Sequence, residues 1–142
     1  MSATDDRDAR IIHPNGWGSP RGYSDAMSAS GRYITLAGQI GWNPVRGAIE
    51  TGDFAAQTHQ ALSNIVTLLA AAGAEPSHLV RLTWFVTNRD EYAGARKAIG
   101  AAYRELIGAH FPPMSVIIVA GLLEPSAKVE IEATAVVPLK NL

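Results

Sequence analysis

The segment 53–73 constrains the fold more than any other part of this sequence, because apolar residues recur along it every three or four positions. That spacing predicts an amphipathic α-helix. Asp53 suits the N-cap position, and Gly73 suits the left-handed backbone conformation that often follows a helix. The apolar stripe consists of Phe54, Ala61, Leu62, Ile65, Leu68, Leu69 and Ala72. The helix therefore has one face that needs a partner layer.

Two segments on either side of this helix have the pattern of strands. The short apolar segment 33–38 follows the turn pair Ser30-Gly31, and we expect 26–29 to be its hairpin partner. Segment 79–87 alternates Leu82, Trp84 and Val86 with Thr83, Phe85 and Thr87. This alternation predicts a strand with both faces in use.

Two further strands are expected near the end of the chain. Pro112-Pro113 breaks the chain before the β-branched segment 115–119. In 129–137, Glu130, Glu132 and Thr134 alternate with apolar residues. The last strand is therefore expected to have one polar and one apolar face.

A second helix is expected over 88–108, where Asn88 and Glu91 resemble a capping box and Gly108 marks the end. Its apolar stripe is Tyr92, Ala95, Ile99, Ala102, Tyr103 and Leu106. The element order β-β-α-β-α-β-β predicts an α+β two-layer sandwich with both helices on one face of a single sheet. Since the other face also carries apolar residues, we expect an oligomer.

The domain organisation follows from length and composition. A chain of 142 residues with 47% hydrophobic and 18% charged residues fits one domain with a sizeable core. Gly and Pro are dense in the first part of the chain, so that 1–20 is expected to be an N-terminal extension or loop and 21–142 the domain.

Charge and composition exclude several classes. The formal net charge of −1 argues against a constitutive nucleic-acid-binding protein. The absence of cysteine excludes disulfides, thiolate catalysis and cysteine-based zinc sites. No apolar run approaches the ~20 residues that span a bilayer, so no membrane association is expected. Segment 1–10 is polar and lacks the apolar stretch of a signal peptide, which favours a cytoplasmic protein.

Residues with acid-base potential are few. His13, His59, His78 and His110 do not share a helix face, so the sequence predicts no metal site. Glu130 and Glu132 lie on one strand face roughly 6–7 Å apart, a separation at which two carboxylates can share general acid-base work. A solvated sheet face is the alternative for this pair.

Other candidate residues also have two interpretations. Arg96 flanks the apolar stripe of the second helix, where an arginine is usually a surface residue. The aromatic residues Trp17, Trp42, Trp84 and Tyr23 suit either a pocket lining or base stacking. Because basic residues are sparse around them, core or pocket lining is the better interpretation.

Several segments, taken in order, resemble the RidA/YjgF family, also called endoribonuclease L-PSP or reactive imine/enamine deaminase. The resemblance extends over about 21–138, nearly the whole chain. Its carriers are Gly22-Tyr23-Ser24-Asp25-Ala26, Gly38-Gln39-Ile40, Gly52-Asp53-Phe54-Ala55-Ala56-Gln57-Thr58, Gln60-Ala61-Leu62-Ser63-Asn64, Ala71-Ala72-Gly73-Ala74, Thr83-Trp84-Phe85-Val86-Thr87, the 112–119 strand and Val129-Glu130-Ile131-Glu132-Ala133-Thr134-Ala135-Val136.

The resemblance implies a fold and an activity. The fold is a chorismate-mutase-like α+β sandwich with a mixed sheet, assembled as a homotrimer with ligand clefts between subunits. Such a trimer would cover the exposed sheet face. Family members typically hydrolyse 2-enamine or 2-imine derivatives of amino acids to 2-keto acids and ammonia, without a metal or an organic cofactor.

The family's site residues match this chain in part. Glu130 fits the glutamate that positions the hydrolytic water, Tyr23 fits the substrate-orienting tyrosine, and Ser115 fits the serine after the family's arginine. The arginine that would bind the substrate carboxylate is replaced by Met114, whose thioether donates no hydrogen bond. Gly22 stands where the family usually has proline.

The missing arginine leaves the carboxylate contact open. We hypothesise that Arg96, where many relatives carry a cleft-facing asparagine, restores an anion contact; an exposed arginine is the alternative. Met114 and Trp42 together indicate a more apolar pocket than usual, suited to an aromatic or alkyl-bearing ligand. Val116 and Phe85, from matched segments, complete the expected substrate-binding set.

Three functions remain open from the sequence. The first is a hydrolase acting on an imine, an enamine or a related carbonyl compound, and not an efficient 2-imino-acid deaminase because of Met114. The second is a trimeric small-ligand-binding or regulatory protein that has lost the chemistry. The third and weakest is an endoribonuclease, which the near-zero charge and the missing arginine disfavour.

Overall fold

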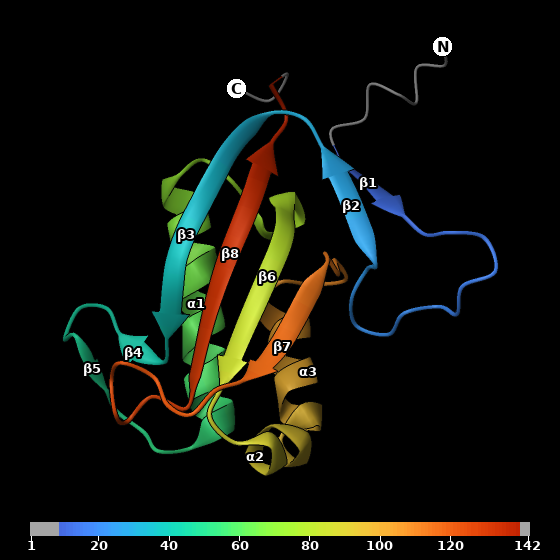
Figure 1. Ribbon diagram of the computed structural model, residues 1–142. Coiled ribbons are helices and arrows are strands. Elements are labelled where there is room, and N and C mark those ends of the chain that lie inside the picture. Colours follow the sequence, from blue (N-terminus) through green and yellow to red (C-terminus); the bar gives the residue numbers. More distant parts are fainter. Residues whose placement is uncertain (1–8, 140–142) are drawn as a thin grey trace.

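The main sheet has four strands, and helices cover one of its faces in the computed structural model, which describes residues 9–139 (Figure 1). The strand order is β3 (Arg32–Ile40), β8 (Val129–Val137), β6 (Leu79–Val86) and β7 (Met114–Ile118). The β6–β7 pair is parallel and the other two pairs are antiparallel. The predicted α+β class with a mixed sheet and helices on one face is confirmed.

Strand β8 organises this sheet, because it lies between β3 and β6 and pairs with both. Its apolar positions are buried under the helices, whereas Glu130, Glu132 and Thr134 alternate with them on the uncovered face. The predicted strand 129–137 and its two faces are confirmed. The side of the sheet that holds Glu130 is called the open face below.

Helix α1 (Phe54–Ala71) packs its stripe against the sheet, with Ala61, Leu62, Ile65 and Leu69 fully buried. The Asp53 carboxylate accepts a hydrogen bond from the Ala56 backbone N–H at 2.9 Å, as expected for the N-cap. Gly73 has φ of 75°, as its predicted role requires. Leu68 was predicted to belong to the stripe, but its side chain is 40% exposed because it lies beyond the edge of the buried face.

The predicted second helix is divided into α2 (Arg89–Gly94) and α3 (Arg96–Leu106). Ala95 leaves helical geometry, and its N–H is shared between the carbonyls of Glu91 and Tyr92. The Asn88 side chain does cap α2 by accepting from the Glu91 N–H at 2.8 Å. The Glu91 carboxylate does not complete a capping box, because it pairs with Lys128 Nζ at 2.8 Å.

The predicted hairpin between 26–29 and 33–38 is wrong. Strand β2 (Ala26–Ala29) pairs with β1 (Ala9–Ile12), and the two form a separate ribbon beside the main sheet (Figure 1). Between β2 and β3, Gly31 packs so closely on β8 that a Cβ there would lie 2.1 Å from the Val137 carbonyl oxygen. This approach brings the start of β3 against the end of β8, where Arg32 pairs with Val137.

The ribbon also corrects the expectation of a loop over 1–20. Residues 9–12 are a strand, because the β-branched pair Ile11-Ile12 extends against Met27 and Ala26. Residues 1–8 lie outside the described part of the chain. The remaining small elements are β4 (Trp42–Asn43), β5 (Ala48–Ile49) and the 3₁₀-helix η2 (Pro76–His78).

Two buried polar side chains of α1 hold the segments around the open face. The fully buried Gln57 amide donates to the carbonyls of Thr51 and Ser126 at 3.0 Å each and accepts from the Lys128 N–H at 2.8 Å. Asn64 donates to the Trp42 carbonyl at 3.0 Å. Buried amides that are fully bonded in this way fix loop positions. Within 9–139, no helix has the length and apolar character needed to cross a bilayer.

Candidate functional site

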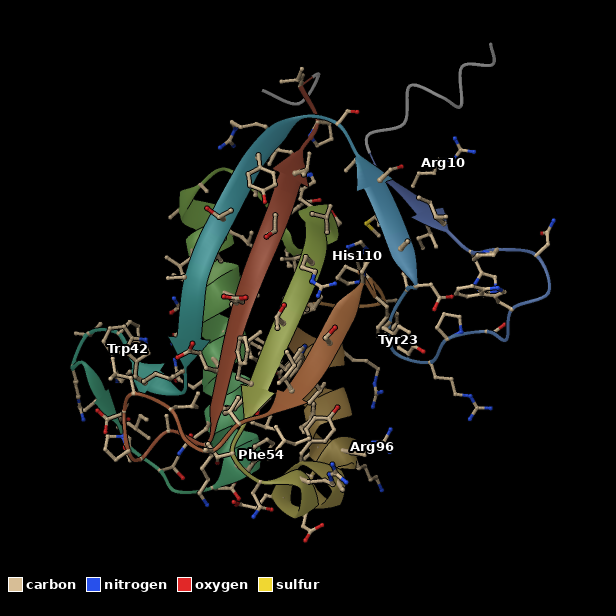
Figure 2. All side chains as sticks on the ribbon, viewed as in Figure 1. Arg10, Tyr23, Trp42, Phe54, Arg96 and His110 are labelled. Atoms are coloured by element: carbon tan, nitrogen blue, oxygen red, sulfur yellow. The ribbon has the colours of Figure 1, made fainter. Side chains whose placement is uncertain are left out.

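Six of the eight predicted site residues line two separate cavities and one groove. Figure 2 shows Trp42 beside β4 at one end of the sheet, and Arg96 on the opposite side at the start of α3. Tyr23 lies in the segment that leads into β2 (Figure 2). Within one chain, the structure therefore does not bring Glu130, Arg96 and Tyr23 into one cavity.

The first cavity, called the α3 cavity, has a volume of about 360 Å³. It brings together Arg96, Met114 and Val116, three of the predicted substrate-binding residues. Met114 and Val116 pair in register with Leu82 and Trp84 of β6, on the helix-covered side of the sheet. Its wall consists of Arg21, Gly22, Trp84, Tyr92, Arg96, Ile99, Gly100, Tyr103, Arg104, Phe111, Met114 and Val116.

The sequence of α3 explains how one wall of this cavity forms. Arg96, Gly100 and Arg104 follow each other at intervals of four residues and line one face of the helix. Ile99 and Tyr103 lie beside them and are buried. Gly100 contributes no side chain to this face, and the Arg104 guanidinium lies beside it, with Nη1 3.5 Å from the point that a Cβ would occupy.

The α3 cavity is cationic. Arg21, Arg96 and Arg104 line it, and its wall contains no Asp or Glu. Among residues 9–139, none of these arginines makes a hydrogen bond or an ion pair. Like charges gathered without counter-charges repel one another, so such an arrangement favours the binding of an anion.

Two further polar groups of the cavity wall behave differently. The Tyr103 hydroxyl donates to the His110 carbonyl at 2.6 Å, and burial raises the pKa of this hydroxyl well above its usual value. Tyr103 is therefore neutral and already bonded. Trp84 is 3% exposed, and its buried Nε1–H has no acceptor among the described residues. Unsatisfied buried donors are rare in folded proteins, and this one gives the wall a single unpaired N–H group.

The second cavity, called the Glu130 cavity, has a volume of about 260 Å³ and lies on the open face. It is lined by Gly38, Ile40, Trp42, Leu123, Glu124 and Glu130. The Glu130 side chain lies directly over Gly38, where a Cβ would approach its Oε2 atom to 2.5 Å. The Glu130 carboxylate can therefore occupy this position only because residue 38 has no side chain. Trp42 lines this cavity with Glu130, whereas Met114, which was expected to share an apolar pocket with Trp42, lines the α3 cavity of the same chain.

Phe85 and Ser115 also lie on the open face. Phe85 stands opposite Glu130 in the β6–β8 register, and Ser115 stands opposite Thr83 in the β6–β7 register. The guanidinium of Arg81 reaches the Ser115 hydroxyl at 3.5 Å. Ser115 therefore faces away from Met114, its neighbour in sequence, and does not line the α3 cavity.

Tyr23 borders a third hollow. It is 43% exposed and lines a groove with His13, Asp25, His110 and Phe111. Its neighbour Ser24 is buried and fixes this segment, donating from its hydroxyl to the Phe111 carbonyl and from its N–H to the Pro112 carbonyl. Phe111 lines both this groove and the α3 cavity, so Tyr23 lies next to the latter.

Sequence reasoning assigned neither Arg21 nor Arg104 to a site, and it gave Trp84 only as a core or pocket-lining residue. Arg104 was detectable from its spacing of eight residues from Arg96, which places both on one helix face. Arg21 and Trp84 had no local signal that pointed to a common cavity. Across 9–139, no group of three His, Asp or Glu side chains is placed to hold a metal ion.

The fold and these cavities define an α+β protein with a small-molecule-sized hollow on each side of its sheet. The family model described as Endoribonuclease L-PSP matches residues 18–137. The chain therefore belongs to this family, the RidA/YjgF family, as the sequence resemblance indicated.

Individual relatives agree with this assignment. The chain is 37% identical over 106 residues to the 2-iminobutanoate/2-iminopropanoate deaminase of Escherichia coli strain K12, covering 75% of this chain and 80% of that protein. It is 35% identical over 115 residues to Protein DfrA of Myxococcus xanthus, covering 80% and 84%. A crystal structure of YyfB, a Rid-family protein of unknown function from Yersinia pestis, superposes with a TM-score of 0.81 at 35% identity, covering 92% and 100%.

Proposed function

We propose that this chain is a RidA-like hydrolase that acts on an imine, an enamine or a related carbonyl compound. The observation that carries the proposal is the placement of Glu130, whose carboxylate lies over Gly38 beside Trp42 in a cavity of the open face. A carboxylate in such a hollow is suited to position and deprotonate a water molecule. Membership in a family that includes imine deaminases supports this chemistry.

The reaction needs only a base and groups that orient the substrate. Glu130 accepts a proton from water while the water oxygen bonds to the C=N carbon, and the π electron pair of that bond moves to nitrogen, which takes up a proton from the solvent. In the resulting carbinolamine, the amine nitrogen receives the proton held by Glu130, directly or through water. The C–N bond then breaks, the electron pair of the O–H bond forms the C=O bond, and ammonia and the hydroxyl proton are released, so that Glu130 is again a carboxylate. A carbonyl compound remains. Tyr23 is proposed to orient the substrate.

The separation of the two cavities supports an oligomeric site. Glu130 lies on the open face, whereas Arg96 and Met114 lie on the helix-covered side. The open face also exposes Tyr33 at 68% and the apolar side chain of Ile117. We infer a homotrimer with a chorismate-mutase-like arrangement, in which Glu130 of one subunit faces the α3 cavity of another. Light scattering should then give a mass three times the chain mass of 15.1 kDa.

Met114 limits the range of substrates. In the family motif this position carries the arginine that binds the substrate carboxylate, and a thioether cannot replace a guanidinium in that role. Arg96 lines the same cavity as Met114 and is proposed to supply the anion contact. We therefore expect low activity on small 2-imino acids. The same substitution favours a second candidate function, a small-ligand-binding trimer without turnover.

Replacing Glu130 separates these two functions. Imines are generated in the assay from amino acids by an amino-acid oxidase, and release of the carbonyl product is followed for the native chain and for Glu130→Gln. A general base of this kind contributes roughly 10²–10⁴-fold to the rate. We expect a loss of about 100-fold, with an unchanged melting temperature.

The outcome against the proposal is equally clear. Equal rates for the native chain and Glu130→Gln would exclude Glu130 as the base. No turnover by the native chain on any imine, together with a ligand-induced rise in melting temperature, would favour the binding protein.

A further inference from the structure

Two of the three arginines that line the α3 cavity, Arg96 and Arg104, belong to helix α3. Arg96 and Arg104 are eight residues apart on the same face of α3, which corresponds to about 12 Å along the helix axis. Neither has an anionic partner among residues 9–139. A small 2-imino acid has a single carboxylate and reaches only one of them. The second cation is therefore left without a role by the proposed reaction.

The middle of the cavity is apolar and aromatic. Trp84, Tyr92 and Phe111 contribute rings, and Ile99, Met114 and Val116 contribute aliphatic or thioether surface. Phe111 stacks on Tyr103 with ring centroids 5.3 Å apart, which fixes its position. Apolar walls with a few convergent polar groups are typical of small-molecule sites, and about 360 Å³ lies within their usual size.

Gly100 leaves room on this face for the Arg104 side chain. The Nη1 atom of Arg104 lies 3.5 Å from the point that a Cβ at position 100 would occupy. The Arg104 guanidinium therefore lies against α3 beside Gly100, about one turn before its own Cα atom. A large side chain at position 100 would displace this guanidinium.

We propose that the α3 cavity binds an elongated molecule with an aromatic or apolar body and a carboxylate at each end, one carboxylate on Arg96 and the other on Arg104. Arg21 adds a third positive charge to the same cavity. This inference deepens the proposed function, on which it rests, because it names the substrate class of that site. Arg104 is the residue that selects dianionic over monoanionic ligands.

The test compares two probes that share one ring system, naphthalene-2,6-dicarboxylate and naphthalene-2-carboxylate. Their binding to the full chain is measured by isothermal titration calorimetry. We expect the dicarboxylate to bind at least tenfold more tightly, because it gains a second carboxylate–guanidinium contact. In Arg104→Ala this difference is lost, whereas the affinity for the monocarboxylate is unchanged. In Arg96→Ala the affinity for both probes falls about tenfold.

Two controls locate the binding. Arg46→Ala removes an arginine that pairs with Glu50 at 3.1 Å on a different part of the surface, and it should leave both affinities unchanged. Gly100→Leu displaces the Arg104 guanidinium and should weaken binding of the dicarboxylate. The proposal is overturned if the dicarboxylate binds no more tightly than the monocarboxylate, if Arg104→Ala weakens both equally, or if Gly100→Leu changes neither.

This binding test is independent of turnover. The affinities are measured in the absence of any imine, so they do not depend on hydrolysis. If hydrolysis is absent but the preference is found, the proposed reaction fails and the binding inference stands. If imines are hydrolysed but the preference is absent, only the inference about the substrate class fails.

Discussion

The two cavities on opposite sides of the sheet have opposite charges. The α3 cavity is lined by three arginines and no acidic side chain. The Glu130 cavity is lined by Glu124 and Glu130 and no positively charged side chain. The charge of the first suits a ligand with carboxylates, and the second holds the proposed base, Glu130. Under the proposed function, one side of the subunit supplies binding and the other supplies the reacting carboxylate. Facing cavities of opposite charge would also favour association between subunits.

The largest expected effect concerns the Glu130 cavity. Gly38→Ala would place a methyl group within 3.0 Å of three atoms of the Glu130 side chain, so the carboxylate has to move. Because a misplacement of 1 Å can cost about 100-fold in rate, we expect a loss of that order in hydrolysis. Little stability should be lost, since the displaced group is the end of a flexible side chain.

Gly52→Ala is the matched control for this variant, because a Cβ at position 52 meets nothing within 4 Å. It should retain native hydrolysis. A crystal structure or an activity profile of Gly38→Ala that equals the native chain would show that the Glu130 carboxylate does not need its observed position.

A smaller effect is expected for a substitution in the α3 cavity. Met114→Arg introduces into the α3 cavity the guanidinium that the sequence resemblance implies at this position, and under the proposed function the activity on small 2-imino acids should rise about tenfold in kcat/KM, equivalent to ~1.4 kcal/mol. Met27→Arg, on the ribbon strand β2, serves as the control for added charge. No gain in Met114→Arg over Met27→Arg would show that the loss of this arginine does not limit the activity.

The smallest effect is a pH dependence of stability. Burial raises the pKa of Tyr103 above its usual value of 10.0, so the folded state holds the phenolic proton more tightly than the unfolded state. The stabilisation is complete below pH 10 and is lost as the pH rises beyond it. Tyr103→Phe should remove this part of the pH dependence and cost about 1 kcal/mol at pH 7 through the lost hydrogen bond to His110.

Urea unfolding of Tyr103→Phe and the native chain at pH 7 and above pH 10 provides the measurement. Identical slopes of stability against pH for the two proteins would show that Tyr103 is not buried as described.

Local patterns predicted the elements that carry their own signal. Strand 129–137 was predicted with its bounds because its alternation of period two is strict, and α1 was predicted because Asp53 and Gly73 mark its ends. The pairing of β2 could not be predicted locally, because it depends on β1 and on the approach of Gly31 to β8. The break at Ala95 lacked a proline signal.

Some residues of the candidate site could likewise be predicted from the sequence, whereas others depend on tertiary packing. The resemblance pointed to Met114 and Arg96, and the structure places them in one cavity. It could not show that Glu130 lies on the other side of the sheet, since that depends on which strand faces the helices cover. Arg21 and Trp84 meet Arg104 only through tertiary packing, so no spacing in the sequence could reveal their shared cavity.

The positions of the three tryptophans have a practical consequence for spectroscopy. Trp84 lies in the α3 cavity wall, Trp42 beside Glu130, and Trp17 on the loop of the ribbon, where it is 61% exposed. The buried indole of Trp84 emits at shorter wavelength than the solvated indole of Trp17. Each region therefore carries its own fluorophore, and single-tryptophan variants can report ligand entry on either side of the sheet without an added label.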